Sequence, residues 1–419
     1  MEFKKSIFNY EYKRSKDEFV LYNTFSKGIV VLNDEEHKRY ESDSFDEETF
    51  SVLKDNGILV ENDFDEIAFL KYFHYKTKFA NNVLYLTIAP TLDCNFGCPY
   101  CYENRRHGKM SVEVQDKLIE YISLKLKNGV TNLHLTWYGG EPLLYFDILE
   151  RMTKKIIRLT NDNNCLLKLE IVTNGYLLTK PIVDKLDEFG FSRLQITIDG
   201  LRENHNKRRH LIGGQATFDK IIENLSLFDD SQINVFIRMN VDNENAGDYK
   251  PLKEMIDSIG NKNIKVYASP VEDLNKDKPN SVSQFMSNKE FDKFTVDSYN
   301  NNSIDTDELT VMDDRYCFCT AEIENCYVVD ENGDFYKCWD QVGRNEYVCF
   351  NVLNYEKVNY SNISKYLVYD PFEDEKCKNC VFLPVCFGGC KFQRYVLNKS
   401  VCGFSDETIQ KYLETTFFD

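Results

Sequence analysis

The chain has 419 residues, of which 42% are apolar and 28% are charged. This composition is typical of a soluble globular protein, and the length predicts two or three domains. The 51 basic and 68 acidic residues give a net charge of −17, which argues against a nucleic-acid or anionic-membrane binder. No apolar run approaches the roughly 18 residues needed to span a bilayer, and the N-terminus lacks the apolar segment of a signal peptide. We therefore expect a cytoplasmic protein.

Residues 1–80 contain no cysteine and predict a small module of strands and helices. Two apolar segments, 20–23 and 28–32, flank a Ser-Lys-Gly turn and predict a β-hairpin. Helical stretches follow near residues 34–40 and 46–56, and the next segment, from residue 57 to 60, predicts a closing strand. This order of elements predicts a winged-helix-like module, although a simple cap is an alternative.

Residues 83–271 alternate regularly between strand-like and helix-like segments. Ser111 is placed to cap the first helix, in which Val114, Leu118 and Ile122 share one face. The alternation runs through six units, which predicts an α/β fold with a parallel sheet, best described as a partial (β/α)6 TIM-like barrel. The chemistry of such sheets lies at the C-terminal ends of the strands. The predicted strands are 83–89, 132–138, 167–173, 193–198, 234–241 and 264–268, and the later helices 144–160, 181–189, 218–227 and 249–259.

Residues 272–312 are polar and predict a connecting segment, helical in part near 287–299, before a cysteine-rich region at 313–419. The chain has 14 cysteines: three at positions 94, 98 and 101, one at 165, and ten between 317 and 402. In a reducing compartment, clustered cysteines more often bind metal than form disulfides. Cys165 and Cys349 fall outside every motif, so we expect them to be buried apolar residues.

The first cluster of cysteines follows the first predicted barrel strand directly. Cys94, Cys98 and Cys101 are separated by three and by two residues, a spacing with which one loop can hold three irons of a [4Fe–4S] cluster. The fourth iron then has no protein ligand and is open to another molecule. A zinc knuckle that lacks one ligand is the alternative.

This CxxxCxΦC pattern, with Tyr100 as the aromatic residue, resembles the defining loop of the radical S-adenosylmethionine (SAM) enzymes. The ends of the next strands resemble further motifs of that family in the same order. Gly139-Gly140-Glu141-Pro142 resembles the GGEP motif, which receives the methionine amino group of SAM. The later motifs are TNG at Thr173-Asn174-Gly175 and S-x-D-G…H-x-x-x-R at Thr197-Ile198-Asp199-Gly200…His205…Arg209.

By this resemblance, Arg209 pairs with the methionine carboxylate, which the fork of an arginine matches geometrically. Its neighbours Arg208 and His210 are easily confused with it. Thr197 stands where the family usually has serine. The resemblance implies one set of SAM-contacting residues, with Arg238 and its neighbour Asn240 as weaker candidates. The set is Tyr100, Gly139, Gly140, Glu141, Asn174, Thr197, Asp199, Arg209 and Arg238.

The C-terminal cysteines closely resemble the seven-cysteine signature of the SPASM domain, which implies two auxiliary [4Fe–4S] clusters and therefore three clusters in all. Gly333 and Cys338 form its G-x4-C, and either Cys317 or Cys319 has the spacing of its first cysteine. Without the upstream motifs, zinc would compete for these thiols. The implied ligands are Cys319, Cys338 and Cys390 for cluster I, with Cys317, Cys326 or an open site as the fourth, and Cys377, Cys380, Cys386 and Cys402 for cluster II.

Enzymes with this C-terminal domain mostly modify peptides or proteins. The resemblance implies a maturase of the sactipeptide and ranthipeptide type, which uses a 5′-deoxyadenosyl radical to form a thioether between a cysteine sulfur and a carbon. It also implies a precursor peptide whose leader segment adds as a strand to the N-terminal module, and an electron donor such as flavodoxin or ferredoxin. A sulfatase-type formylglycine maturase, a carbon–carbon crosslinking enzyme and an epimerase are alternatives, as is a non-catalytic iron–sulfur protein. Sulfatase maturases typically have an aspartate directly after the cysteine that matches Cys338, whereas this chain has Trp339, and Asp340 comes next. No catalytic base is assigned.

Overall fold

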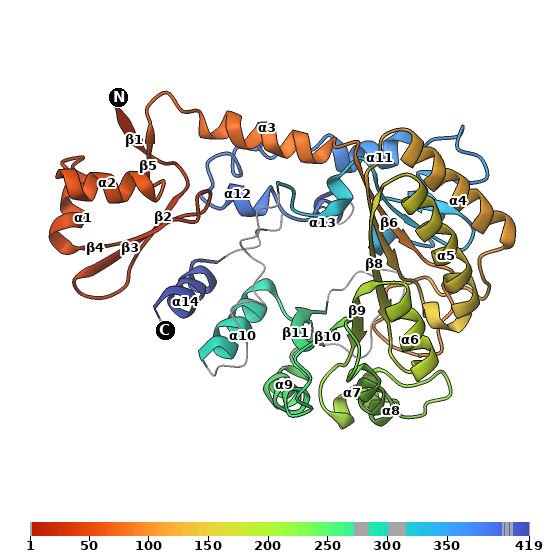
Figure 1. The fold of residues 1–419 in the computed structure, drawn as a ribbon. Coiled ribbons are helices and arrows are strands. Elements are labelled where there is room, and N and C mark those ends of the chain that lie inside the picture. Colours follow the sequence, from red (N-terminus) through yellow and green to blue (C-terminus); the bar gives the residue numbers. More distant parts are fainter. Residues whose placement is uncertain are drawn as a thin grey trace. The chain divides into compact units, whose positions relative to one another are not determined.

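The computed structural model describes residues 2–271, 285–300, 316–395, 398, 402 and 405–418. The chain divides into two compact units. The barrel unit consists of Asn81–Asp305 and Glu324–Ser364, and the terminal unit consists of Met1–Ala80, Thr306–Ile323 and Lys365–Asp419. Figure 1 shows the elements of both units. Among the described residues, no helix combines the length and the apolar character needed to cross a membrane.

The barrel unit is built on a nine-stranded sheet with the order β11-β10-β9-β8-β7-β6-β12-β13-β14. Strands β6 to β11 are parallel and follow one another in chain order, which confirms the predicted barrel topology. Helices between these strands lie outside the sheet (Figure 1), as expected for right-handed crossover connections. The barrel strands are β6 Val83–Ile88, β7 Asn132–Trp137, β8 Leu166–Thr173, β9 Phe191–Thr197, β10 Asn234–Val241 and β11 Ile264–Pro270.

Helices α4, α5, α6, α8 and α9 pack their apolar faces on this sheet and close one continuous core. Ser111 caps α4 by accepting a hydrogen bond from the backbone N–H of Val114, as the sequence predicts. The helices of this unit are α4 Val112–Lys127, α5 Phe146–Asp162, α6 Lys180–Glu188, α7 Arg202–Arg208, α8 Phe218–Leu225, α9 Tyr249–Asp257 and α10 Asn288–Asn300. Helix α11, Tyr360–Leu367, begins in this unit and ends in the terminal unit. The short helix η1, Pro142–Tyr145, precedes α5.

A segment of the cysteine-rich region extends the barrel sheet. Strand β12, Cys326–Val329, pairs in parallel with β6, and β13, Asp334–Tyr336, and β14, Phe350–Asn351, follow antiparallel. Residues 324–364 therefore belong to the barrel unit, although they are far from β6 in sequence. This register places Cys338 shortly after a strand of the same sheet.

The terminal unit combines the N-terminal segment with the last part of the chain. Its three-stranded sheet has the order β2-β3-β4, and the predicted hairpin corresponds to β3 and β4. Residues 1–80 and 365–419 contribute apolar side chains to two common cores. In one of them, Phe8 and Leu70 pack with Phe372, Leu383 and Phe387. The elements are β1 Phe3–Lys5, β2 Asn9–Lys13, β3 Glu18–Asn23, β4 Ile29–Asn33, α1 Asp34–Glu41, α2 Glu47–Asp55, β5 Leu59–Glu61, α3 Glu66–Lys78, α12 Leu383–Cys386, α13 Lys391–Tyr395 and α14 Asp406–Phe417.

Leu133 of β7 is fully buried at the centre of the barrel core, so Leu133→Ala should lower the free energy of unfolding by about 2–5 kcal/mol. Leu166 at the start of β8 is 73% exposed, and Leu166→Ala is the matched control with a change below about 0.5 kcal/mol. Urea denaturation followed by circular dichroism measures both. Equal effects of the two substitutions would contradict the assigned core.

Candidate active site

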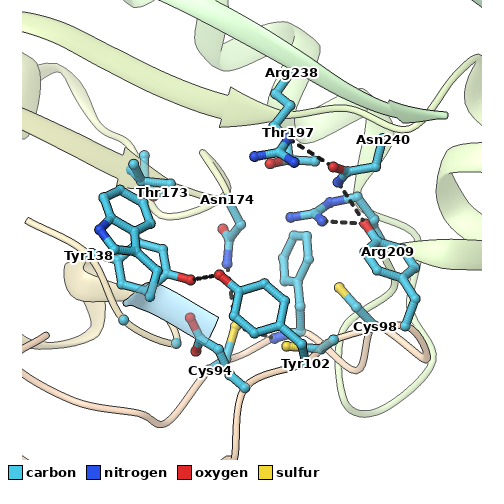
Figure 2. Close-up of a pocket in the computed structure, with 18 of the residues that line it drawn as sticks. Cys94, Cys98, Tyr102, Tyr138, Thr173, Asn174, Thr197, Arg209, Arg238 and Asn240 are labelled. Atoms are coloured by element: carbon cyan, nitrogen blue, oxygen red, sulfur yellow. Dashed lines mark hydrogen bonds between the residues drawn. The ribbon is translucent and has the colours of Figure 1, made fainter. Parts of the chain in front are cut away.

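A cavity of about 420 Å³ lies at the carboxyl ends of the barrel strands. Figure 2 shows that residues from well-separated loops converge on it. Parallel strands present their C-terminal loops at one edge of the sheet, which is why residues far apart in sequence meet there. Ten of the lining residues are among the predicted cluster ligands and SAM contacts: Cys94, Cys98, Tyr100, Cys101, Gly139, Gly140, Asn174, Thr197, Arg209 and Arg238.

The three cysteines of the first motif all border this cavity. Cys94 and Cys98 are half-buried and Cys101 is exposed, so each thiol is accessible from the cavity side. The backbone N–H of Phe96 donates to the Cys94 sulfur at 3.4 Å, and the Asn174 amide approaches the same sulfur at 3.9 Å. Burial raises the pKa of the Cys94 thiol, so the free site favours the neutral thiol and binding of a metal would displace its proton.

The glycines of the second motif allow the cysteine loop to approach the end of β7 closely. A Cβ atom on Gly140 would lie 2.1 Å from the backbone oxygen of Asp93, which directly precedes Cys94. A Cβ on Gly139 would lie 2.3 Å from the backbone oxygen of Thr91, and its φ of +122° also favours glycine. The two glycines therefore hold the cysteine loop against the turn after β7.

Glu141 of this motif does not line the cavity, because its carboxylate is fully buried behind the turn. It accepts hydrogen bonds from the backbone N–H of Leu143 at 2.9 Å, the Thr173 hydroxyl at 2.7 Å and the backbone N–H of Asn174 at 2.7 Å. Burial nevertheless raises the pKa of Glu141. The side chain thus joins the ends of β7 and β8, and recognition of the SAM amino group by this turn stays a prediction.

The Tyr100 hydroxyl is hydrogen-bonded to three other side chains on one wall of the cavity. Its hydroxyl donates a short hydrogen bond to Asp199 and accepts hydrogen bonds from Arg209 at 2.7 Å and from Asn240 at 3.3 Å. The aromatic residue of the cysteine motif therefore orients the predicted carboxylate-binding arginine. The Nε atom of Arg209 is buried without a hydrogen-bond partner among the described residues, so the guanidinium has capacity left for a ligand.

The structure distinguishes Arg209 from its two basic neighbours. Arg208 is fully buried and donates to Asp242 at 2.7 Å, and it does not reach the cavity. The ring of His210 contacts the backbone oxygen of Leu211 at 2.8 Å and is also absent from the cavity lining. Of the three candidates, Arg209 is thus the one placed to meet a bound carboxylate.

His205 of the same motif has a supporting role. Its Nδ1 accepts from the backbone N–H of Asp199 at 3.2 Å, and its Nε2 lies 3.0 Å from the Thr217 hydroxyl. Burial lowers the pKa of His205 well below its usual value, so the ring stays neutral and Nε2 carries the proton. Thr217 in turn donates to the backbone oxygen of Arg209. This chain of hydrogen bonds fixes the loop that carries Arg209.

Polar side chains of β9, β10 and β11 complete this wall. Arg238 donates to Asn240 at 2.9 Å and to Ser269 at 2.9 Å, and Thr197 lies beside them in the cavity lining (Figure 2). Hydroxyl, amide and guanidinium groups are suited to the ribose hydroxyls and polar atoms of a nucleoside. Their placement agrees with the expected SAM contacts, which stay predictions.

One wall of the cavity is aromatic and was not predicted from the sequence. Tyr102 and Tyr138 share a short hydrogen bond between their hydroxyls (Figure 2). The centroid of the Tyr138 ring lies 4.4 Å from that of the Trp339 ring. Glu103 also lines the cavity, and burial raises its pKa to about 7. Tyr102, Tyr138 and Trp339 each stand next to a motif residue, namely Cys101, Gly139 and Cys338, and this was the one sign of them in the sequence. Adjacency in the sequence does not reveal that the three segments meet in space.

The cysteines of the C-terminal region are distributed over both compact units. Cys326 and Cys338 belong to the barrel unit, and Cys317, Cys319, Cys377, Cys380, Cys386, Cys390 and Cys402 belong to the terminal unit. Burial raises the pKa of the Cys380 thiol, and the charges of Cys377 and Cys402 act in the same direction. The assignment of both auxiliary clusters stays a prediction. Cys165 and Cys349 are buried in the barrel core, as expected.

Comparisons with known proteins agree with this geometry. Residues 88–257 match the model of the radical SAM superfamily. A cysteine-type anaerobic sulfatase-maturating enzyme from Clostridium novyi is 24% identical over 336 residues, which cover 71% of this chain and 85% of that enzyme. A GTP 3′,8-cyclase from Campylobacter fetus is 31% identical over 144 residues, which cover 34% of this chain and only 41% of the cyclase.

Two solved structures share the fold. The structure of anSMEcpe with bound AdoMet and the Cp18Cys peptide has a TM-score of 0.63 at 20% identity, and covers 80% of this chain and 97% of its own. Streptococcus suis SuiB bound to the precursor peptide SuiA has a TM-score of 0.56 at 17% identity, and covers 98% of this chain and 100% of its own. The family match covers residues 88–257, and the fold and the motifs agree with it; together they indicate a radical SAM enzyme with a cysteine-rich C-terminal region.

The described residues fit the cofactors of this class. Three thiols of one loop face the cavity, and the glycine turn beside them has no room for a side chain. The buried Nε of Arg209 lacks a partner and is suited to a carboxylate. The cavity therefore has the residues that a [4Fe–4S] cluster on Cys94, Cys98 and Cys101, with SAM beside it, would need, and this assignment stays a prediction.

Arg209→Lys should weaken SAM binding by roughly ten-fold or more, because lysine lacks the planar fork that meets a carboxylate and the Tyr100 hydroxyl together. Equilibrium dialysis of the anaerobically reconstituted enzyme measures the affinity. Arg202→Lys is the control, since Arg202 is exposed and pairs with Asp219 at 2.6 Å away from the cavity. Unchanged affinity in the Arg209 variant would mean that the methionine carboxylate binds elsewhere.

Proposed function

We propose that this enzyme is a peptide maturase that removes a hydrogen atom from a ribosomally made precursor peptide and forms a thioether from a cysteine sulfur to a carbon. The observation that carries the proposal is the composition of the cavity. Its cysteine loop and its arginine-rich wall suit a cluster and SAM, while the aromatic wall of Tyr102, Tyr138 and Trp339 is left for a substrate. Such a wall suits apolar and aromatic parts of a peptide side chain.

When bound, the cluster and SAM supply a 5′-deoxyadenosyl radical, and the protein supplies binding, orientation and exclusion of water. Arg209, held by Tyr100, would orient the methionine end of SAM. The glycine turn would hold the cysteine loop in place, and the aromatic wall would keep substrate carbon near the site of radical formation. Glu103 and Asp340 contribute carboxyl groups to the lining of the cavity.

The C-terminal cysteines support two auxiliary [4Fe–4S] clusters, so that the enzyme would hold three. An auxiliary cluster near the substrate can take up the electron that remains after bond formation, and an open iron can bind a substrate thiolate. An electron donor such as flavodoxin or ferredoxin would reduce the first cluster. The structure of SuiB bound to its precursor peptide supports a peptide substrate for this fold.

A sulfatase-type formylglycine maturase is the second candidate. The Clostridium novyi relative is aligned over most of its length, and Asp340 lines the cavity two residues after Cys338. Trp339 directly follows Cys338, however, where the resemblance leads one to expect the aspartate. Mass spectrometry of a modified peptide separates the candidates, because a thioether retains the peptide sulfur and formylglycine made from cysteine loses it.

Replacing Cys94, Cys98 and Cys101 together by alanine should remove one cluster and leave the others, because the remaining cysteines lie in a separate part of the chain. Iron and acid-labile sulfide of the anaerobically reconstituted protein should fall from about 12 to about 8 irons per chain, and 5′-deoxyadenosine should no longer form. Replacing Cys165 and Cys349 by alanine is the control. Undiminished 5′-deoxyadenosine in the triple variant would refute the site assignment.

The N-terminal module offers an open strand edge for a leader peptide. In the sheet order β2-β3-β4, β4 is an edge strand among the described residues. The backbone N–H of Asn23 donates to Gly28, so the alternating antiparallel pattern leaves the N–H of Val31 pointing away from β3. The Val31 side chain is 41% exposed, in agreement with an accessible edge. Strand addition would use such outward backbone groups.

Val31→Pro should therefore abolish modification of a full-length precursor, while cleavage of SAM without peptide is spared. Val31→Thr keeps both the backbone N–H and the branched side chain, and is the matched control. This test is sharper than deletion of residues 1–80, because that segment shares its core with residues 365–419. Chromatography of the products measures both activities, and normal modification by Val31→Pro would refute strand addition at β4.

A further inference from the structure

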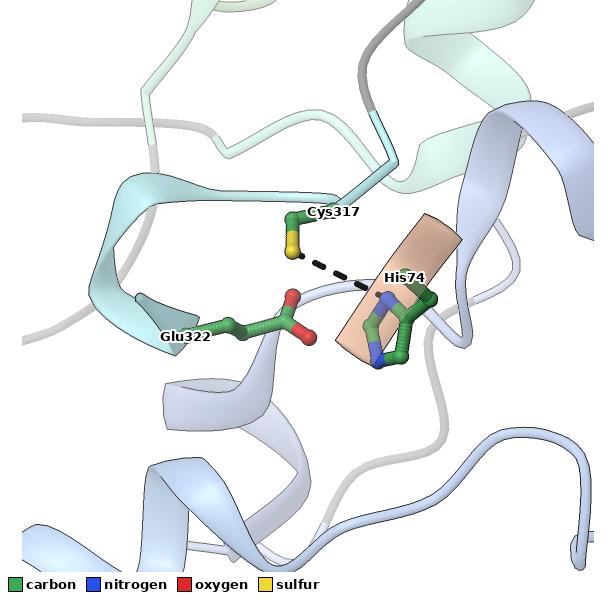
Figure 3. A group of neighbouring side chains, drawn as sticks. All are labelled: His74, Cys317 and Glu322. Atoms are coloured by element: carbon green, nitrogen blue, oxygen red, sulfur yellow. Dashed lines mark hydrogen bonds between the residues drawn. The ribbon is translucent and has the colours of Figure 1, made fainter. Parts of the chain in front are cut away.

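Three buried side chains of metal-binding type meet in the terminal unit, apart from the cavity described above. They are His74 of α3, Cys317, and Glu322 in the short helix η6, Thr320–Glu322. One ligand atom from each lies within 4.8 Å of those of the other two, and all three side chains are buried. Figure 3 shows the sulfur, the carboxylate and the imidazole directed toward a common point.

Several polar atoms of this group lack partners, which is costly in a buried position. The Nε2 of His74 and the Oε2 of Glu322 have no hydrogen-bond partner among the described residues. The Nδ1 of His74 lies 2.5 Å from the backbone oxygen of Tyr316 and 3.7 Å from the Cys317 sulfur. A ring that donates its Nδ1 proton to a carbonyl carries the lone pair on Nε2, and metal-bound histidines are held in this manner.

Aromatic side chains around His74 hold its ring in place, and the three side chains are buried away from solvent. The His74 ring stacks on Phe387 at 5.1 Å with an angle of 8° between the planes, and contacts Phe372 edge-on at 5.6 Å. Burial lowers the pKa of His74 to about 4, so the imidazole is neutral and competent to ligate at physiological pH.

Two buried lysines lie close to this group, and one of them can pair with Glu322 in place of a metal ion. Lys391 lies 3.2 Å from Oε1 of Glu322 and donates to the backbone oxygens of Phe387 and Gly389, and Lys78 donates to that of Tyr369. Their positive charges oppose a dication, but burial lowers the pKa of Lys78 and favours its neutral form. Without a metal, Lys391 and Glu322 would form a simple buried ion pair, and the test below separates these two states.

We propose that His74, Cys317 and Glu322 form a mononuclear zinc site that joins α3 to the segment between Cys317 and Glu322. Zinc binds nitrogen, sulfur and carboxylate oxygen in tetrahedral sites, and a site with three protein ligands leaves the fourth position to water or another small ligand. This inference is independent of the peptide substrate. It also resolves the choice of the first SPASM cysteine in favour of Cys319, because Cys317 is then occupied by zinc.

The test measures metals in the full-length enzyme after anaerobic cluster reconstitution and dialysis against EDTA, so that the cluster cysteines are filled with iron. Mass spectrometry should find about one zinc per chain, and His74→Phe and Cys317→Ala should each remove it while iron and sulfide stay unchanged. Cys349→Ser, which replaces a buried thiol of the barrel unit, should retain the zinc. Lys391→Met should retain it as well, since this change removes an opposing charge.

X-ray absorption at the zinc edge of the unmodified enzyme gives a second readout that does not depend on any variant. One sulfur and nitrogen or oxygen ligands are expected, whereas three or four sulfurs would place the zinc in a cluster site and overturn the proposal. Absence of zinc from the wild-type enzyme would also overturn it and leave the Lys391–Glu322 ion pair. A loss of iron in Cys317→Ala would show instead that this thiol is a cluster ligand.

Discussion

The burial of the Glu141 carboxylate is the constraint on which the arrangement of the active site depends. A buried carboxylate is tolerated only when hydrogen bonds replace its lost hydration, and here Leu143, Thr173 and Asn174 supply them. Leu143 lies just after Glu141 in the turn that follows β7, whereas Thr173 and Asn174 lie at the end of β8, so the carboxylate joins the ends of the two strands. Asn174 also contacts Cys94, so the same carboxylate helps to position the cysteine loop.

The cavity has two chemically different walls, and this difference suits a polar cofactor on one side and an organic substrate on the other. Tyr100, Asp199 and Arg209 form a charged, hydrogen-bonded wall on one side of the cysteine loop. Tyr138 and Trp339 form an aromatic wall that ends beside Cys338. A polar cofactor is held best by the first wall and an organic substrate by the second, so the reacting carbon would lie between SAM and the cysteine-rich region.

Most elements of the barrel were predictable, because six strands of β-branched and apolar residues alternate with amphipathic helices. The cysteine, glycine, TNG and arginine motifs were equally visible, since each follows a strand in chain order. Helix α3 was not predictable, because its polar and apolar residues do not form a clear helical stripe, and strands β1 and β2 are too short to be recognised. Tyr102, Tyr138 and Glu103 were not predictable either, because no spacing pattern distinguishes a lining tyrosine from a core one.

The sequence by itself determined the class of chemistry: thiol spacing, glycine turns and the order of motifs are local properties of the chain. Only the tertiary structure decided which of the neighbouring side chains are used. It places Arg209 in the cavity and buries Arg208 against Asp242, although the two residues are adjacent. It also brings His74 to Cys317 across more than 240 positions of the chain. Such choices depend on burial and hydrogen bonding between distant segments, which no local pattern encodes.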